Sequence, residues 1–103
     1  MNERRRFVPR QRRRLKLSIG GRVPAFTADV SPGGFAADVM HVLRPGTELQ
    51  GSITLAGREF DFTGEVSWAR AGSPHLSLRG RIGVRFTGIS SDFHRLFRST
   101  YGS

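Results

Sequence analysis

Apolar and polar residues alternate along most of this chain. Apolar side chains recur at every second position in residues 15–19, and Gly20-Gly21 separates this run from a second one over residues 23–30. Alternation with a period of two, bounded by glycine turns, predicts antiparallel strands that bury one face. The first two runs are therefore expected to form a hairpin.

In the second run, alternate residues are expected on opposite faces of the strand. The alternation predicts that one face lies in the core and carries Phe26, Ala28 and Val30. Thr27 and Asp29 fall on the opposite face, and Ser31 shares their parity. We therefore expect the side chains of Asp29 and Ser31 to leave the sheet on its outer surface.

Four more strands are expected before the C-terminal tail. They cover residues 35–39, 49–55, 59–68 and 82–86, with turns at Ser31-Pro32-Gly33-Gly34, Arg44-Pro45-Gly46 and Ala56-Gly57 and a polar loop over residues 70–81. The third of these four has the clearest alternation, which places on its inner face Phe60, Phe62, Val66 and Trp68. A core or helix-packing role is thus the favoured interpretation for Trp68.

The tail changes to a helical period. Apolar side chains recur at helical spacing at Ile89, Phe93, Leu96, Phe97 and Tyr101. Ser90 or Ser91 is a suitable N-cap, so a helix is predicted over about residues 90–101. Short strands with frequent turns and one terminal helix indicate an all-β fold, a six-stranded antiparallel barrel that the helix covers. The expected organisation is a basic arm over residues 1–14 and a barrel domain over residues 15–103.

Charge is concentrated in the arm. The chain carries a net charge of +9, and residues 1–16 hold seven Arg and Lys16 against Glu3, a net of +7. A cationic arm attracts phosphate, in nucleic acid, lipid headgroups or nucleotides. The alternative is a solvated tail without a ligand.

Few residues in the sequence suggest a catalytic site or a metal site. The chain has no cysteine, and its three histidines, at positions 41, 75 and 94, lie at no metal-ligand spacing. Asp61 and Glu65 are expected on an exposed face and receive no role. We expect no enzyme activity, no metal and no cofactor. No apolar run approaches the roughly 20 residues of a membrane span, and a cytoplasmic location is expected.

Two short stretches together suggest a ligand site. Arg6 and Arg10 lie on the arm, and the strand end Asp29-Val30-Ser31 runs into the turn Pro32-Gly33-Gly34. A carboxylate complements the N1/N2 edge of guanine, an Arg fork complements its O6/N7 edge, and glycines let a ligand approach backbone N–H groups. The combination fits guanine and phosphate.

These stretches resemble the two motifs of the PilZ domain, the bacterial receptor module for cyclic di-GMP. Arg6–Arg10 is similar to the family motif RxxxR. Asp29–Gly34 is similar to the downstream family motif, in which Asp or Asn is followed by xSxxG. Gly64-Glu65-Val66-Ser67-Trp68 and Ile82-Gly83-Val84-Arg85-Phe86 also fit the family pattern, so the resemblance covers essentially the whole chain. It implies a PilZ-type barrel that binds cyclic di-GMP without catalysis.

The resemblance also implies roles for single residues. Arg6 and Arg10 would bind phosphates and guanines, with Asp29, Ser31, Gly33 and Gly34 on the barrel side of the site. An Arg just before the motif, here Arg5, goes with an intercalated ligand dimer in this family. Trp68 stands where some members place an aromatic side chain against the ligand, which is the alternative to its core role.

Some alternatives stay open. A second RxxxR, Arg10 to Arg14, overlaps the first, and Arg12, Arg13 and Arg14 exceed what the ligand needs. The expected partner is an unidentified effector protein, reached through ordering of the arm. A nucleic-acid-binding barrel is disfavoured because no exposed aromatics are expected for base stacking. A ligandless PilZ-like adaptor is the third hypothesis.

Overall fold

The chain forms a closed six-stranded barrel with one helix, as expected. The computed structural model describes residues 10–20, 23–72 and 80–102. The elements are β1 (Lys16–Ile19), β2 (Val23–Ser31), β3 (Gly34–Val39), β4 (Glu48–Leu55), β5 (Arg58–Arg70), β6 (Gly80–Ile89) and α1 (Ser91–Tyr101). All neighbouring strands are antiparallel, in the order β1-β2-β3-β6-β5-β4 around the barrel.

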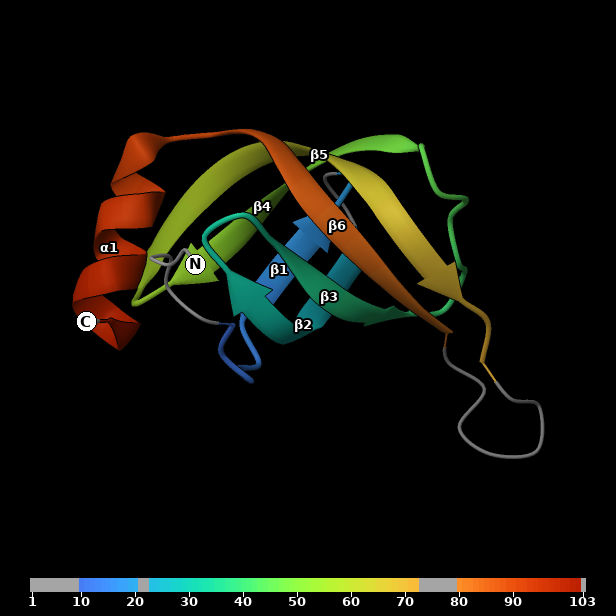
Figure 1. Ribbon diagram of the computed structural model, residues 1–103, viewed down its shortest axis with the longest axis horizontal. Helices are drawn as coiled ribbons and strands as arrows, with labels where there is room; N and C mark the ends of the chain where they lie inside the picture. Colours follow the sequence, from blue (N-terminus) through green and yellow to red (C-terminus); the bar gives the residue numbers. More distant parts are fainter. Residues whose placement is uncertain (1–9, 21–22, 73–79, 103) are drawn as a thin grey trace, which may run out of the picture.

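Helix α1 covers one end of the barrel (Figure 1). The Ser90 hydroxyl accepts a hydrogen bond from the Asp92 amide at 3.1 Å, so Ser90 is the N-cap and the helix begins one residue later than expected. Phe93 and Phe97 are fully buried against the barrel, and Phe93 makes edge contacts with Phe60 and Phe86. Ile89, expected on the helix, is instead the last residue of β6.

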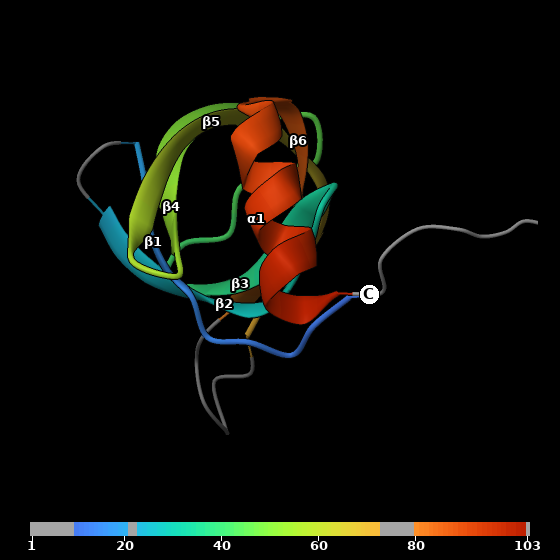
Figure 2. The same cartoon turned by 90° about the vertical axis from the view of Figure 1, so that its left-hand side faces the viewer.

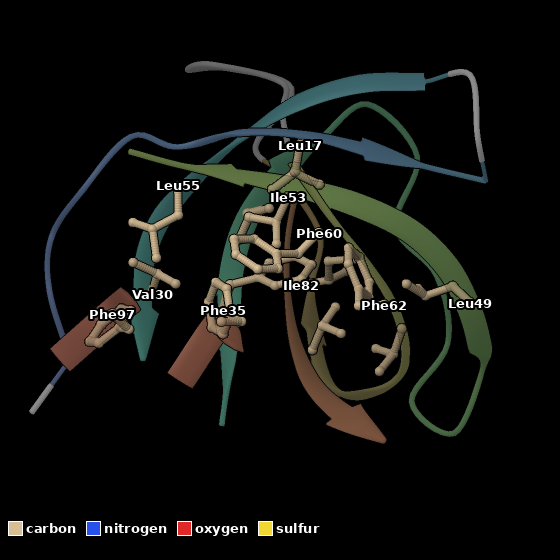
Figure 3. Close-up of a cluster of buried hydrophobic side chains, with 14 residues drawn as sticks. Leu17, Val30, Phe35, Leu49, Ile53, Leu55, Phe60, Phe62, Ile82 and Phe97 are labelled. Carbon is tan, nitrogen blue, oxygen red and sulfur yellow. The ribbon is translucent and has the colours of Figure 1, made fainter. Parts of the chain in front are cut away.

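The core fills the barrel with aliphatic and aromatic side chains. Phe35 and Phe62 meet edge to face, with ring centroids 5.5 Å apart. Figure 3 shows Val30, Leu55 and Phe97 gathered toward the end that carries α1. Such packing of inward-facing residues accounts for the alternation along the sequence.

The faces of β2 do not follow simple alternation. The register with β3 shifts between Thr27 and Asp29, which leaves Ala28 as an extra residue. Thr27 and Val30 are consequently both buried, whereas Phe26 is 42% exposed. The prediction that Phe26 and Ala28 share the inner face with Val30 is wrong, because the bulge reverses the parity upstream of it.

A second bulge changes the face of Trp68. In β5, Val66 pairs with Val84 and Trp68 pairs with Gly83, so Ser67 is the extra residue. Val66 stays in the core, and Trp68 turns to the outer surface, where it is 41% exposed. The core or helix-packing role predicted for Trp68 is therefore wrong.

Candidate functional site

Arg10 and Asp29 meet on the outer face of the barrel. Arg10 Nη1 lies 2.5 Å from Asp29 Oδ1, and the two side chains keep 54% and 30% of their surface exposed. The bulge at Ala28 turns Asp29 outward while Val30 stays in the core. The structure thus brings together one residue from each motif, and Arg5 and Arg6 lie outside the described residues.

The segment leading to Arg10 is held against β2. Gln11 and Val30 exchange two backbone hydrogen bonds, of 2.7 and 2.8 Å. The buried Thr27 hydroxyl accepts from the Leu15 amide at 2.8 Å and donates to the Arg13 carbonyl. Residues 10–15 therefore lie on the barrel, although the sequence assigned most of them to the arm.

The turn after Asp29 is packed against two neighbours. Gly34 is buried, and a Cβ on it would lie 2.0 Å from the Val84 carbonyl oxygen, so glycine is required there by the close approach of β6. Nothing lies within 4 Å of a Cβ on Gly33, which is exposed. His94 of α1 hydrogen bonds to the Pro32 carbonyl at 2.9 Å. The helix thus fixes the turn, and Gly33 presents its open side.

Trp68 lies over the backbone of β6. A Cβ on Gly83 would be 2.1 Å from Trp68 Nε1, so the indole occupies the space that a side chain would need. The Arg70 guanidinium is 6.0 Å from the indole centroid. Trp68 and Phe26 are both exposed aromatics, which contradicts the expectation that the barrel surface has none.

The strand register aligns Asp29 and Trp68 in one row. Asp29 pairs with Ala36, Ala36 with Gly83, and Gly83 with Trp68. Three inter-strand steps of about 4.8 Å give this row a length of roughly 14 Å. We call these four residues the Asp29–Trp68 row. Its two middle members, Ala36 and Gly83, have the smallest side chains and form the floor of the row. Both are buried, and the Trp68 indole covers Gly83.

Ion pairs flank the row on both sides. Arg85 pairs with Glu65 at 2.5 Å, and Arg81 with Asp38 at 2.8 Å. The hydrogen bond to Asp38 raises the pKa of Arg81, and the charges of Asp38 and Asp29 act in the same direction against partial burial. Each of these two arginines is already paired with a carboxylate, so the row is flanked by ion pairs of no net charge that present guanidinium donors on either side.

The sequence analysis missed the floor and its flanks. Ala36, Gly83, Arg81 and Arg85 come from β3 and β6, which are far apart in sequence and adjacent in the barrel. Small residues inside otherwise alternating strands were the available signal, since they often mark the close approach of another group.

Two of the surplus arginines lie over aromatic rings of the helix and the barrel. Arg13 lies over the Tyr101 ring at 5.0 Å and Arg14 over the Phe26 ring at 4.4 Å, so two of the three surplus arginines have aromatic neighbours. Within residues 10–20, 23–72 and 80–102, no group of three His, Cys, Asp or Glu side chains is placed to hold a metal ion. No helix in the described part of the chain is long and apolar enough to cross a membrane.

Comparison with known proteins shows the family and the fold of this chain. No curated protein sequence matches the chain. The solved structure described as Bacillus subtilis Inhibitor of motility (MotI/DgrA) superposes with a TM-score of 0.75 at 18% sequence identity, over 96% of this chain and 52% of that one. This chain thus has the same fold and spans about half the length of that protein. The family model of the PilZ domain matches residues 2–102, so the chain belongs to the PilZ domain family.

Proposed function

We propose that this protein is a non-enzymatic receptor that binds cyclic di-GMP on the Asp29–Trp68 row. The observation that carries the proposal is the Arg10–Asp29 ion pair on the outer face, beside the Pro32-Gly33 turn. Membership of the PilZ family supports the same class of ligand. Arg5 and Arg6, from outside the described residues, are proposed to complete the site.

The ion pair leaves donors and acceptors for a ligand. One Arg10 nitrogen and one Asp29 oxygen contact each other. A guanidinium has five N–H donors and a carboxylate about four acceptor positions, so both groups can bind further partners without separating. The Asp29 carboxylate suits the N1/N2 edge of guanine, and Arg10 suits its O6/N7 edge or a phosphate.

Exchange of the pair for ligand contacts would also cost little. Both side chains are partly exposed, and an exposed ion pair typically contributes only about 0–1 kcal/mol. A hydrogen bond to a charged group contributes about 1.5–3 kcal/mol. Contacts with the guanine and phosphate therefore outweigh any loss of the pair.

Trp68 supplies an aromatic surface at the other end of the row. Its exposed indole can stack on a base, an interaction that contributes about 1–3 kcal/mol. The small floor residue Gly83 makes room for this indole on the sheet. A row of roughly 14 Å has room for more than one base, and the Arg5 position supports an intercalated dimer of the ligand.

The proposed relay is a change in the arm when ligand binds. Residues 10–15 are already held on β2, so this part adds little ordering cost to binding. The change is proposed for the residues before Arg10, which lie outside the described residues. It would alter the surface that an effector protein meets.

Calorimetric titration of the full chain with cyclic di-GMP tests the proposal. We expect a dissociation constant near or below about 1 µM. Arg10→Ala and Asp29→Asn should each weaken binding by about tenfold or more, since each removes a charge-assisted contact. Asp61→Asn, an exposed carboxylate on β5 away from the row, should change nothing.

Three outcomes would contradict the receptor proposal. Absence of heat at about 50 µM ligand would favour the ligandless adaptor. Equal weakening by Asp61→Asn would show a general charge effect instead of a site. Efficient displacement of the dinucleotide by a single-stranded oligonucleotide, with a steep salt dependence, would favour the nucleic-acid-binding barrel.

A further inference from the structure

Strands β2 and β3 separate at the end of the barrel away from α1. Their paired register runs from Ser31/Gly34 to Thr27/Ala37 and stops there. In the described part of the chain, residues 23–26 of β2 then pair only with β1, and residues 38–39 of β3 pair only with β6. Beyond the last pair, each strand therefore has an edge that no other described strand covers.

A groove of about 450 Å³ occupies this separation. We call it the β2–β3 groove. Its apolar lining includes Pro24, Ala25, Phe26, Val39, Met40 and Leu43. The volume lies within the roughly 300–1,000 Å³ typical of ligand pockets. The groove can thus take several apolar side chains.

Two of the lining side chains are unusually exposed. Met40 is 71% exposed and Phe26 is 42% exposed. Large apolar side chains gathered on a concave surface commonly mark an interaction site, whereas scattered ones do not. Methionine also adapts its shape to different partners. The groove therefore has the composition of a docking surface.

The charges around the groove are positive. Arg14 lines it and stacks on Phe26 at 4.4 Å. The exposed Lys16 lies opposite Phe26 in the β1–β2 register. The carboxylate that lines the groove, Asp38, is paired with Arg81 at 2.8 Å. An occupant with negative charge beside its apolar residues would complement this rim.

We propose that the β2–β3 groove docks an extended apolar segment of a partner protein, flanked by Asp or Glu. Two separated strand edges suit an extended segment, which can pair with them through its backbone. A second copy is disfavoured because each chain carries a net charge of +9. A membrane surface is flat, whereas this site is concave. The proposal does not depend on cyclic di-GMP binding.

Selection from a library of random 12-residue peptides, displayed on phage and applied to the full chain, identifies the probes. The enriched peptides should combine Leu, Ile, Val or Phe with Asp or Glu. Their synthetic forms should perturb the backbone amide resonances of residues 25–26 and 38–43 in a nitrogen–proton correlation spectrum. Enrichment of Lys and Arg, or perturbation elsewhere, would overturn the proposal.

A matched pair of variants tests the apolar contact. Met40→Lys and Gln50→Lys add the same charge at exposed positions, and Gln50 lies on β4 outside the groove. Met40→Lys should weaken peptide binding by about tenfold or more, because the apolar contact that a bound peptide would make with the exposed methionine is lost. Gln50→Lys should leave binding unchanged. Equal effects of the two variants would refute the docking site.

Two further measurements distinguish other occupants. Light scattering of the full chain should give the mass of a monomer. A dimer that Met40→Lys dissociates would show that a second copy occupies the groove. Sedimentation with vesicles of phosphatidylcholine and phosphatidylglycerol should show no dependence on Met40. Loss of vesicle binding in Met40→Lys would overturn the proposal in favour of a membrane surface.

Discussion

Replacement of Thr27 by Val tests how the N-terminal segment is attached to the barrel. Thr27 is 2% exposed, and its hydroxyl is the acceptor for the Leu15 amide and the donor to the Arg13 carbonyl. Val has nearly the same shape and no hydroxyl. Both backbone groups therefore lose their partner without formation of a cavity.

The expected loss of stability follows from these two groups. A polar group that loses its partner on burial costs about 1–3 kcal/mol, and Leu15 is only half-buried, so the total should be about 2–4 kcal/mol. At roughly 4 °C per kcal/mol for a domain of this size, Tm should fall by about 8–16 °C. Thr27→Ser keeps the hydroxyl and loses one methyl group, which costs about 1 kcal/mol.

Urea unfolding and amide hydrogen exchange measure both effects. Thr27→Val should lose more stability than Thr27→Ser, and only the Val variant should accelerate exchange of the Leu15 amide. The reasoning is refuted if the Val variant is as stable as the Ser variant. It is also refuted if the Leu15 amide exchanges equally fast in the two proteins.

Three smaller changes have equally direct expectations. Ser90→Ala should lower the free energy of unfolding by about 1 kcal/mol, measured by thermal unfolding, because the α1 N-cap is lost. An unchanged stability would show that the cap does not contribute. Gly34→Ala should cost at least about 2 kcal/mol, since its Cβ would lie 2.0 Å from a β6 carbonyl oxygen, while Gly33→Ala should be nearly neutral; similar urea midpoints for the two would contradict this geometry. Phe26→Ala should cost less than about 1.5 kcal/mol, and the buried Phe62→Ala about 3–5 kcal/mol. A larger loss of stability in Phe26→Ala than in Phe62→Ala would show that Phe26 is a core residue.

Alternation along the chain was enough to predict the number of strands, their antiparallel class and the terminal helix. These features depend on which residues must be buried, and that information is local. Leu17, Phe62 and Val84 are all buried in the structure, as their parity indicates. Parity within the second strand also placed Asp29 on the outer face, where the structure has it.

The bulges at Ala28 and Ser67 could not be predicted in the same way. Ala28 and Ser67 are ordinary strand residues in sequence, and nothing about them signals an extra position. Each bulge is stabilised by long-range pairing, which keeps Thr27 and Val66 in the core. The faces of Phe26 and Trp68 depend on those bulges, so both predictions failed for one physical reason.

The floor of the candidate site depends on the strand order, which the sequence does not show. Ala36 and Gly83 become neighbours only because β3 pairs with β6 instead of with β4. The spacing of residues along the sequence does not indicate which strand pairs with β3. Trp68 and Asp29 share a row only through these two strands, so the site could be assembled only once the strand order was known.

Arg13 and Tyr101 bring the two ends of the domain to one corner. The guanidinium lies 5.0 Å from the centroid of the Tyr101 ring, and Figure 2 shows the segment after residue 10 passing below the C-terminal end of α1. A protein fused after Tyr101 would begin beside the segment that carries Arg10. In a multidomain arrangement, a module attached after Tyr101 would therefore lie at this corner of the barrel, and a change in the segment after residue 10 would reach it through the Arg13–Tyr101 contact. If cyclic di-GMP binds as proposed, this corner is where a fluorescent partner fused after Tyr101 should respond to it.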